Sequence, residues 1–250
     1  MARLRVGLAL LCLVFLQPSF VWSDTASEPS LNLFIWRDYI DPELIEAFEK
    51  SRHVKINVVE FSDDDQREET LLSTQGKGVD IVCVNENYLM APGMLGWVAP
   101  LDMAHLPNLK NVEYPFADKA SEAKRYAVPY FWGTLGIAYR ADLVKKAPTG
   151  WHDLFEQTHS DSGRIALPST LRLLVGITLL ANGKDFNSEN PADLEQASKS
   201  LQTVAPRVFG YLATDITASN PLVTGDAIMA PMFNGDALTV QGINPNIMFV

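Results

Sequence analysis

Cysteine is scarce in this sequence, which limits how the chain can be cross-linked. The 250 residues include two cysteines, Cys12 and Cys83. Cys12 lies in an N-terminal apolar stretch that we expect to be removed, and a single remaining cysteine cannot form an internal disulfide. Cys83 sits in the apolar run IVCVN, where we expect a buried, unreactive thiol. The sequence therefore offers no disulfide framework.

Basic residues are also in short supply. Lysine and arginine number 20 against 30 aspartates and glutamates, a formal net charge of −10. A protein that binds nucleic acid needs a basic face, so this composition argues against a nucleic-acid partner. The acidic balance is compatible with a cationic ligand, although solubility alone also accounts for it.

The short motifs of several enzyme classes are missing. The sequence has no G-x-x-x-x-G-K-[ST] phosphate loop, no complete dinucleotide fingerprint and no G-x-S-x-G nucleophile elbow. Its four histidines show no metal-ligand spacing. We therefore predict a protein that is not an enzyme and that carries no cofactor and no metal. A secreted hydrolase stays the alternative, because catalytic groups can come together from distant positions.

Long apolar runs are absent except at the N-terminus. Residues 1–23 combine two early arginines, a short apolar stretch and small residues at the end, a pattern typical of a secretory signal peptide. We predict that the signal peptide is cleaved after Ser23, or else after Ala26, and that residues 24–30 form a leader. The mature protein is then expected in the periplasm. The alternative is an uncleaved membrane anchor, which Pro18 and the shortness of the run disfavour.

Strand-like and helix-like segments alternate along the rest of the chain. Predicted strands cover residues 31–36, 54–61, 79–84, 164–168, 227–233 and 246–250. Predicted helices begin at Pro42 and cover roughly 63–75, 151–157, 171–180 and 191–204.

This alternation predicts an α/β fold with two lobes, each a mostly parallel sheet flanked by helices. We expect the two lobes to be joined near residues 136–141. The chain ends on the apolar run NIMFV, whereas a natural end is usually more polar. We therefore expect a truncated product or a fragment.

One region carries a family resemblance. The segment FIWRDYIDPELIEAFEK (34–50), followed by VKINVVEF, resembles the start of periplasmic polyamine-binding proteins, the spermidine/putrescine receptors of ABC transporters. Later segments agree in order: GVDIVCVNENYL, GWVAPLD, YAVPYFWGTLGIAYRAD, GWHDLF, NGKDFNSENPADL and TGDAIMAPMFNGDA. The resemblance implies a hinged, two-lobed (type 2) periplasmic binding protein that closes on its ligand. It implies a first lobe over residues 31–138 and a second over 139–250. It also implies that a chain continuing past residue 250 would complete the first lobe.

The resemblance implies ligand contacts from two turns of the first lobe. Trp36, Arg37, Asp38 and Tyr39 match the turn after the first strand, and Asp38 would hold one ammonium group. In the alternative interpretation, Trp36 and Tyr39 are aromatic residues of the core and Asp38 begins the helix.

The second turn follows the strand at 79–84. Here Asn85 would replace a small hydroxyl residue, and Asn87 or Tyr88 would take the place of an aromatic ring. The alternative is an ordinary polar loop.

In the second lobe, the resemblance implies that Phe233 packs on the ligand and that Asp236 meets an amine. Phe233 is a weaker partner for a cation than the family's tryptophan. Asp215 lies near a position that is usually a serine. The alternative for Asp236 is a helix N-cap.

The lobe-two helix departs from the family pattern. Related receptors have carboxylates near the positions that Ser169 and Arg172 occupy. An arginine there repels an ammonium group, so either Arg172 points away or the ligand is not an ordinary polyamine. An acylated or amino-acid-like amine with a carboxylate would suit Arg172 and Arg37.

Taken together, the residues and the resemblance predict a monomeric solute-binding protein that captures a small amine, such as putrescine or spermidine. Its partner would be a membrane ABC permease, or a sensor protein if the role is signalling. A further alternative is a truncated remnant that binds nothing, because an incomplete first lobe leaves a sheet edge open.

Overall fold

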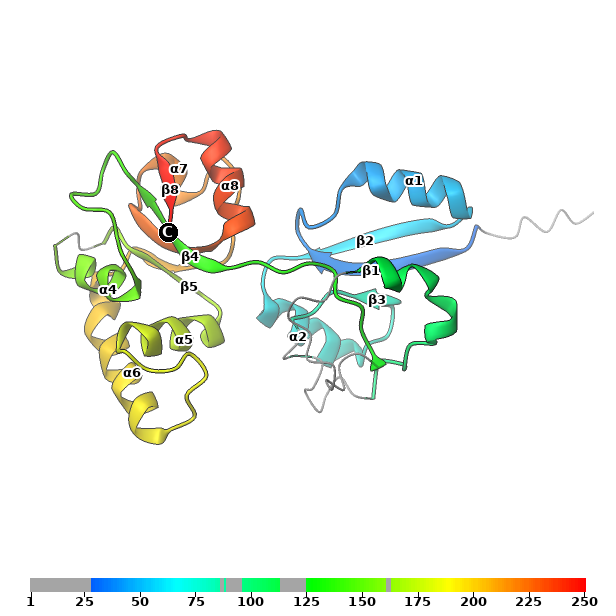
Figure 1. Cartoon of the computed structure of the whole chain (residues 1–250), viewed down its shortest axis with the longest axis horizontal. Coiled ribbons are helices and arrows are strands. Elements are labelled where there is room, and N and C mark those ends of the chain that lie inside the picture. Colours follow the sequence, from blue (N-terminus) through cyan, green and yellow to red (C-terminus); the bar gives the residue numbers. More distant parts are fainter. Residues whose placement is uncertain (1–27, 86–87, 89–95, 113–124, 161–162) are drawn as a thin grey trace, which may run out of the picture.

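The computed structural model describes residues 28–85, 88, 96–112, 125–160 and 163–250. The expected signal peptide, most of the expected leader and Asn87 lie outside these residues. Two α/β bodies lie side by side (Figure 1). We call the described residues up to 112 the first half, residues 125–134 the connecting segment, and residues 135–250 the second half.

The first half is built on a parallel sheet. Strand β1 (Ser30–Trp36) lies between β2 (Lys55–Phe61) and β3 (Ile81–Val82), and pairs in parallel with both. Helices α1 (Pro42–Arg52) and α2 (Asp64–Thr74) lie on opposite sides of this sheet (Figure 1). Two short 3-10 helices follow at Met103–His105 and Pro107–Asn111. The carboxyl ends of the three strands therefore meet at one edge, where loops bring side chains together.

The helix starts in this half follow the sequence. The carboxylate of Asp41 accepts a hydrogen bond from the Glu43 amide at 2.8 Å and caps α1, with Pro42 as its first residue. Asp38 lies three residues earlier in a turn with φ 61°, a conformation that aspartate tolerates better than most residues. The alternative in which Asp38 begins the helix is therefore wrong.

The second half contains a mixed sheet. Strand β4 (Leu135–Arg140) runs antiparallel to both β7 (Met229–Phe233) and β8 (Ile247–Phe249). Strands β5 (Ala166–Pro168) and β6 (Gly210–Leu212) pair in parallel, and a bridge from Ile165 to Met229 joins them to β7. The expectation of mostly parallel sheets thus holds for the first half and for β5–β6, but not for β4. Strand β4 occupies the segment that we expected to join the lobes, and for the predicted strands hydrophobic periodicity carries no information on direction.

Helices cover both faces of this mixed sheet. On one side lie α4 (Trp151–Ser160), α5 (Leu171–Ala181) and α6 (Pro191–Val204), and on the other α7 (Pro221–Thr224) and α8 (Asn234–Ile243) (Figure 1). Ile137, Leu154 and Ile228, each at most 2% exposed, belong to the core beneath the first group. Burial of such side chains is the main force that holds each layer together. Among the described residues, no helix is long and apolar enough to span a bilayer.

The expected boundary between residues 138 and 139 falls inside β4. All six residues of this strand belong to the sheet of the second half, because Leu135 already pairs with Phe233. We therefore propose that the boundary lies before Leu135, at the end of the connecting segment.

Candidate functional site

A large cleft opens between the two halves. Its wall comes from the loops after β1, β2 and β3 on one side, from the loops after β5, β6 and β7 on the other, and from the connecting segment. Its volume is about 2100 Å³, well above the 300–1,000 Å³ of a typical small-molecule pocket. This cleft has the size and position of a site that narrows when two halves approach each other.

The turn after β1 supplies aromatic rings to the cleft. The Tyr39 amide donates to the Trp36 carbonyl oxygen at 3.2 Å, which closes the turn. The Tyr39 ring lies 5.8 Å from that of Trp36 and 5.1 Å from that of Phe131 in the connecting segment. The Tyr130 hydroxyl donates to the Tyr39 carbonyl oxygen at 2.9 Å. These contacts hold a wall of rings against which an apolar stem or a cation can pack.

Asp64, which the sequence analysis missed, lines the same wall. It is the first residue of α2 and only 8% exposed. Its Oδ1 accepts from Nη1 of Arg67 at 2.6 Å, and its Oδ2 accepts from Nδ2 of Asn85 at 2.8 Å. Burial raises the pKa of the Asp64 carboxyl, although Arg67 and Asn85 act in the opposite direction.

Arg67 lies behind this wall and is fully buried. Its guanidinium carbon is 4.5 Å from the ring centre of Tyr88, 5.4 Å from that of Trp36 and 5.5 Å from that of Phe61. It also donates to Glu68 at 3.1 Å. Trp36 and Tyr88 line the cleft, so Arg67 supports these two rings and the Asp64 carboxylate at the same time.

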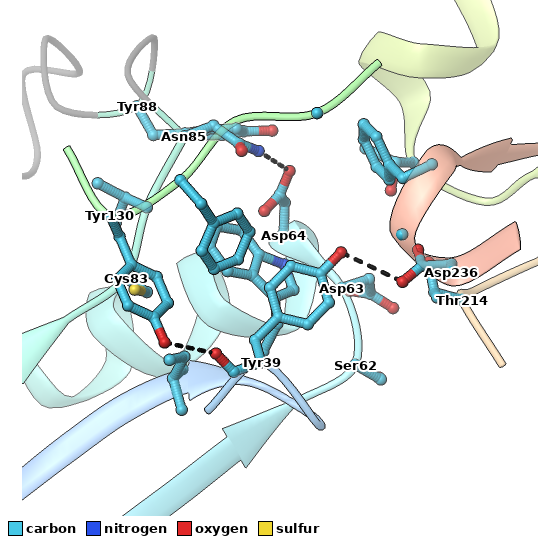
Figure 2. Close-up of a pocket in the computed structure, with 18 of the residues that line it drawn as sticks. Tyr39, Ser62, Asp63, Asp64, Cys83, Asn85, Tyr88, Tyr130, Thr214 and Asp236 are labelled. Atoms are coloured by element: carbon cyan, nitrogen blue, oxygen red, sulfur yellow. Dashed lines mark hydrogen bonds between the residues drawn. The ribbon is translucent and has the colours of Figure 1, made fainter. Parts of the chain in front are cut away.

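Asp236 lies on the opposite side of the cleft. It is 4% exposed, and its Oδ1 accepts a long hydrogen bond of 3.4 Å from the Tyr39 hydroxyl across the two halves (Figure 2). Its buried Oδ2 has no hydrogen-bond partner among the residues that the structure describes. Burial raises the pKa of Asp236 to about 6, although the Tyr39 hydroxyl opposes the shift. Burial also raises the pKa of Tyr39, and the Asp236 charge adds to that effect.

The alternative in which Asp236 caps a helix is wrong. Phe233 occupies the N-cap position of α8, no side chain makes a capping hydrogen bond there, and Asp236 is the third helical residue. Phe233 ends β7 and lines the cleft beside it. Burial of a carboxyl oxygen that has no hydrogen-bond partner among the described residues is costly for the fold, and a cation bound beside Asp236 would offset this cost.

Other expected residues also reach the cleft. Asp38, Asn85, Tyr88 and Asp215 all contribute to its wall. Burial opposes ionisation of Asp215, but hydrogen bonds from Thr217 and Ser219 outweigh it, so the pKa of Asp215 is lowered.

Two expected residues do not line the cleft. The exposed guanidinium of Arg37 lies 3.6 Å from the Glu60 carboxylate, and Arg37 is not part of the wall. Ser169 is exposed just after β5, and its backbone amide donates to the Leu212 carbonyl oxygen at 3.0 Å. Neighbouring positions in a turn point in different directions, which a linear motif does not record. We leave both residues out of the proposed site.

Arg172, by contrast, does reach the cleft wall. Its Nη2 donates to Oδ1 of Asn187 at 3.0 Å, and the residue is exposed. The alternative in which Arg172 points away from the cleft is therefore not supported. What remains is whether the ligand carries a carboxylate that suits this positive charge. Cys83 also lines the cleft, where burial raises the pKa of its thiol.

The chemistry of the cleft is that of binding. Among the described residues, nine acidic and ten aromatic side chains contribute to its wall, against a single arginine. Within the described ranges, no group of three histidine, cysteine, aspartate or glutamate side chains could hold a metal ion. Carboxylates bind ammonium groups, and aromatic faces bind both cations and methylene groups.

Comparison with known proteins places the chain among binding proteins. A family described as bacterial extracellular solute-binding protein matches residues 43–250. A putrescine/agmatine-binding protein of Pseudomonas aeruginosa is 32% identical over 92% of this chain and 68% of that protein. A norspermidine sensor of Vibrio cholerae is 28% identical over 84% of this chain and 57% of that protein.

A similar fold occurs in the crystal structure of a spermidine/putrescine ABC transporter substrate-binding protein from Streptococcus pneumoniae. The two chains share 26% identity and a TM-score of 0.70, over 89% of this chain and 68% of that one. This likeness confirms the predicted α/β fold class with its two-lobed architecture. The chain spans 57% to 68% of the lengths of these three relatives.

Proposed function

Since this chain belongs to the family of bacterial extracellular solute-binding proteins, we propose that it captures a small cationic amine, a polyamine, in the cleft between its halves. Capture favours a closed form because the ligand contacts both halves at once. A membrane ABC permease then receives the amine from the closed form in the periplasm. The relatives described as binding putrescine, agmatine and spermidine support this ligand class.

One observation carries the proposal. Asp236 is a buried carboxylate beside aromatic rings at the boundary between the halves, and its Oδ2 has no partner in the described part of the chain. An ammonium group placed there would supply the missing hydrogen bonds and the missing opposite charge. Its methylene stem would lie along the Trp36 and Tyr39 rings.

Calorimetric titration tests this function. We expect putrescine, spermidine or norspermidine to bind the unchanged protein, and the Asp236→Asn variant to lose at least tenfold in affinity. Glu195→Gln is the matched control, because Glu195 lies on the exposed face of α6, pairs with Lys199 and is not part of the cleft wall. No heat from any of the three amines at millimolar concentration would refute the proposal.

The cleft position of Arg172 gives the titration a second arm. An ω-amino acid carries a carboxylate that Arg172 could bind and an ammonium that Asp236 could bind. Tighter binding of 4-aminobutyrate than of putrescine would replace the polyamine with an amino-acid-like amine. Loss of that preference in Arg172→Gln would identify the residue responsible.

A second candidate role is signalling. The 28% identical relative described as a norspermidine sensor favours it. In this case the closed form would contact a sensor protein rather than a permease. Deletion of the gene distinguishes the two roles: loss of amine uptake supports transport, whereas unchanged uptake with a lost response to external amine supports signalling.

A further inference from the structure

We propose that Asp64 is the second ammonium-binding carboxylate of the cleft, so that the ligand is a linear diamine held by Asp64 of the first half and Asp236 of the second. This inference rests on the proposed function and goes further, because it assigns a subsite that the sequence motifs did not indicate.

The geometry of α2 presents Asp64 to the cleft. Asp63 caps the helix by accepting from the Gln66 amide at 2.8 Å, which makes Asp64 the first helical residue. A carboxylate in the first turn of an 11-residue helix is stabilised by the unpaired amides at that end. Asp64 lines the cleft while Arg67 lies behind it, so the negative end of this buried ion pair faces the ligand space.

Asp64 retains the capacity to bind a cation. An ionised carboxylate offers about four acceptor positions. Arg67 and Asn85 each use one, and both hold the carboxylate in a fixed orientation. Figure 2 shows the hydrogen bond from Asn85. Burial still raises the pKa of Asp64 despite these partners, so a further positive charge would stabilise its ionised form.

Tyr39 connects the two acids. Its hydroxyl donates to Asp236, and the charges of both Asp236 and Asp64 raise its pKa after burial, which is the larger cause. Both carboxylates are therefore within electrostatic reach of one ring. A flexible stem that crosses this ring would place one ammonium at each acid.

The alternative holder of the first ammonium is Asp38. That residue lines the cleft but is exposed, and no hydrogen bond from another described residue fixes its carboxylate. An exposed ion pair contributes little to affinity, whereas a buried and oriented carboxylate contributes more. Asp64 thus gives the first half a buried and oriented carboxylate for the ammonium group, which the exposed Asp38 does not provide.

A pair of ligands tests the assignment. Putrescine carries two ammonium groups, and N-acetylputrescine keeps the stem but replaces one ammonium with a neutral amide. We expect the unchanged protein to prefer putrescine by at least tenfold. We expect Asp64→Asn to lose about tenfold in affinity for putrescine while its affinity for N-acetylputrescine stays within about twofold.

Glu68→Gln is the matched control, because Glu68 is the other partner of Arg67 and does not line the cleft. We expect this variant to keep the preference for putrescine. Equal loss of both ligands in Asp64→Asn would show a purely structural role and overturn the assignment while the proposed function survives.

If Asp64→Asn does not fold, the affinities of the protein without substitutions for putrescine and N-acetylputrescine still test the assignment of Asp64. Equal affinities for the two ligands would overturn the assignment of Asp64. Binding of neither ligand would overturn the proposed function as well.

Discussion

Asp236 couples ligand affinity to pH at the scale of a single residue. Its pKa is raised to about 6 by burial, so it is ionised at pH 7 and mostly protonated at pH 5. The raised pKa of Tyr39 keeps that hydroxyl neutral over this range, and no histidine is among the cleft residues of the described chain. The raised pKa of Asp64 acts in the same direction.

We therefore expect affinity for putrescine to fall about tenfold between pH 7 and pH 5. Titration calorimetry at both values measures it. Asp236→Asn, which cannot titrate at this position, should show a smaller change. A flat profile for the unchanged protein would contradict the role of Asp236.

The same residue makes the unliganded fold sensitive to pH. The carboxyl keeps its proton in the folded state up to about pH 6, whereas in the unfolded chain it ionises near 3.8. Its contribution to stability is therefore lost as pH rises from about 4 to 6. We expect Asp236→Asn to raise the free energy of unfolding at pH 7.5 by on the order of 1–2 kcal/mol, after allowance for solvent screening. Thermal melts at pH 7.5 and pH 3.5 check this, because the difference should vanish at the lower pH.

A substitution of Phe233 should strengthen amine binding. It lines the cleft next to Asp236, and a tryptophan ring attracts a cation more strongly than a phenylalanine ring. We expect Phe233→Trp to strengthen amine binding by about two- to fivefold, equivalent to about 0.5–1 kcal/mol. Phe209→Trp is the control, because Phe209 is 40% exposed and lies outside the cleft wall. Weaker binding in Phe233→Trp would indicate that the larger ring blocks the ligand.

At the scale of the element, the start of α2 links helix stability to the site. Asp63 caps α2 and Asn190 caps α6, and each accepts one backbone hydrogen bond. Loss of such a cap costs about 1 kcal/mol. We expect Asp63→Ala and Asn190→Ala both to lower the free energy of unfolding by about this amount in urea titrations.

Only one of these two variants should affect binding. Fraying of α2 displaces Asp64, and Asp63 itself lines the cleft, whereas no residue of α6 belongs to the described cleft wall. We expect Asp63→Ala to weaken putrescine binding severalfold and Asn190→Ala to leave it unchanged. Equal effects of the two variants on affinity would argue that the start of α2 takes no part in the site.

At the scale of the whole molecule, the open cleft implies movement of the halves. Its volume of about 2100 Å³ far exceeds what a short amine fills. We expect saturating putrescine to lower the radius of gyration measured by small-angle X-ray scattering. The Asp236→Asn variant at the same putrescine concentration should show no such decrease. If putrescine leaves the radius of gyration of the protein without substitutions the same, closure is excluded as the mechanism.

The predicted helices and strands are present in the structure because local periodicity depends only on which face of a segment is apolar. Asp41 and Asn190 begin their helices as expected. Some strands are shorter than predicted: the segment 79–84 contains only Ile81–Val82, and the segment 164–168 only Ala166–Pro168. Strand β4 and helix α8 were not predicted. The match to the solute-binding family confirms the resemblance that the motifs predicted.

The sequence by itself determined the α/β class, the family, and the aromatic and acidic character of the turns that end β1 and β7. The tertiary structure alone decided that β4 is antiparallel, that Arg37 and Ser169 lie outside the cleft, and that Asp64 is buried in its wall with Arg67 behind it. Asp64, Arg67 and Leu71 share one face of α2, but two of them are charged, so the helix looked polar throughout. Whether a charged side chain is buried depends on the distant segments that pack against it, and here those segments are the strand ends at Trp36 and Phe61 and the loop at Tyr88.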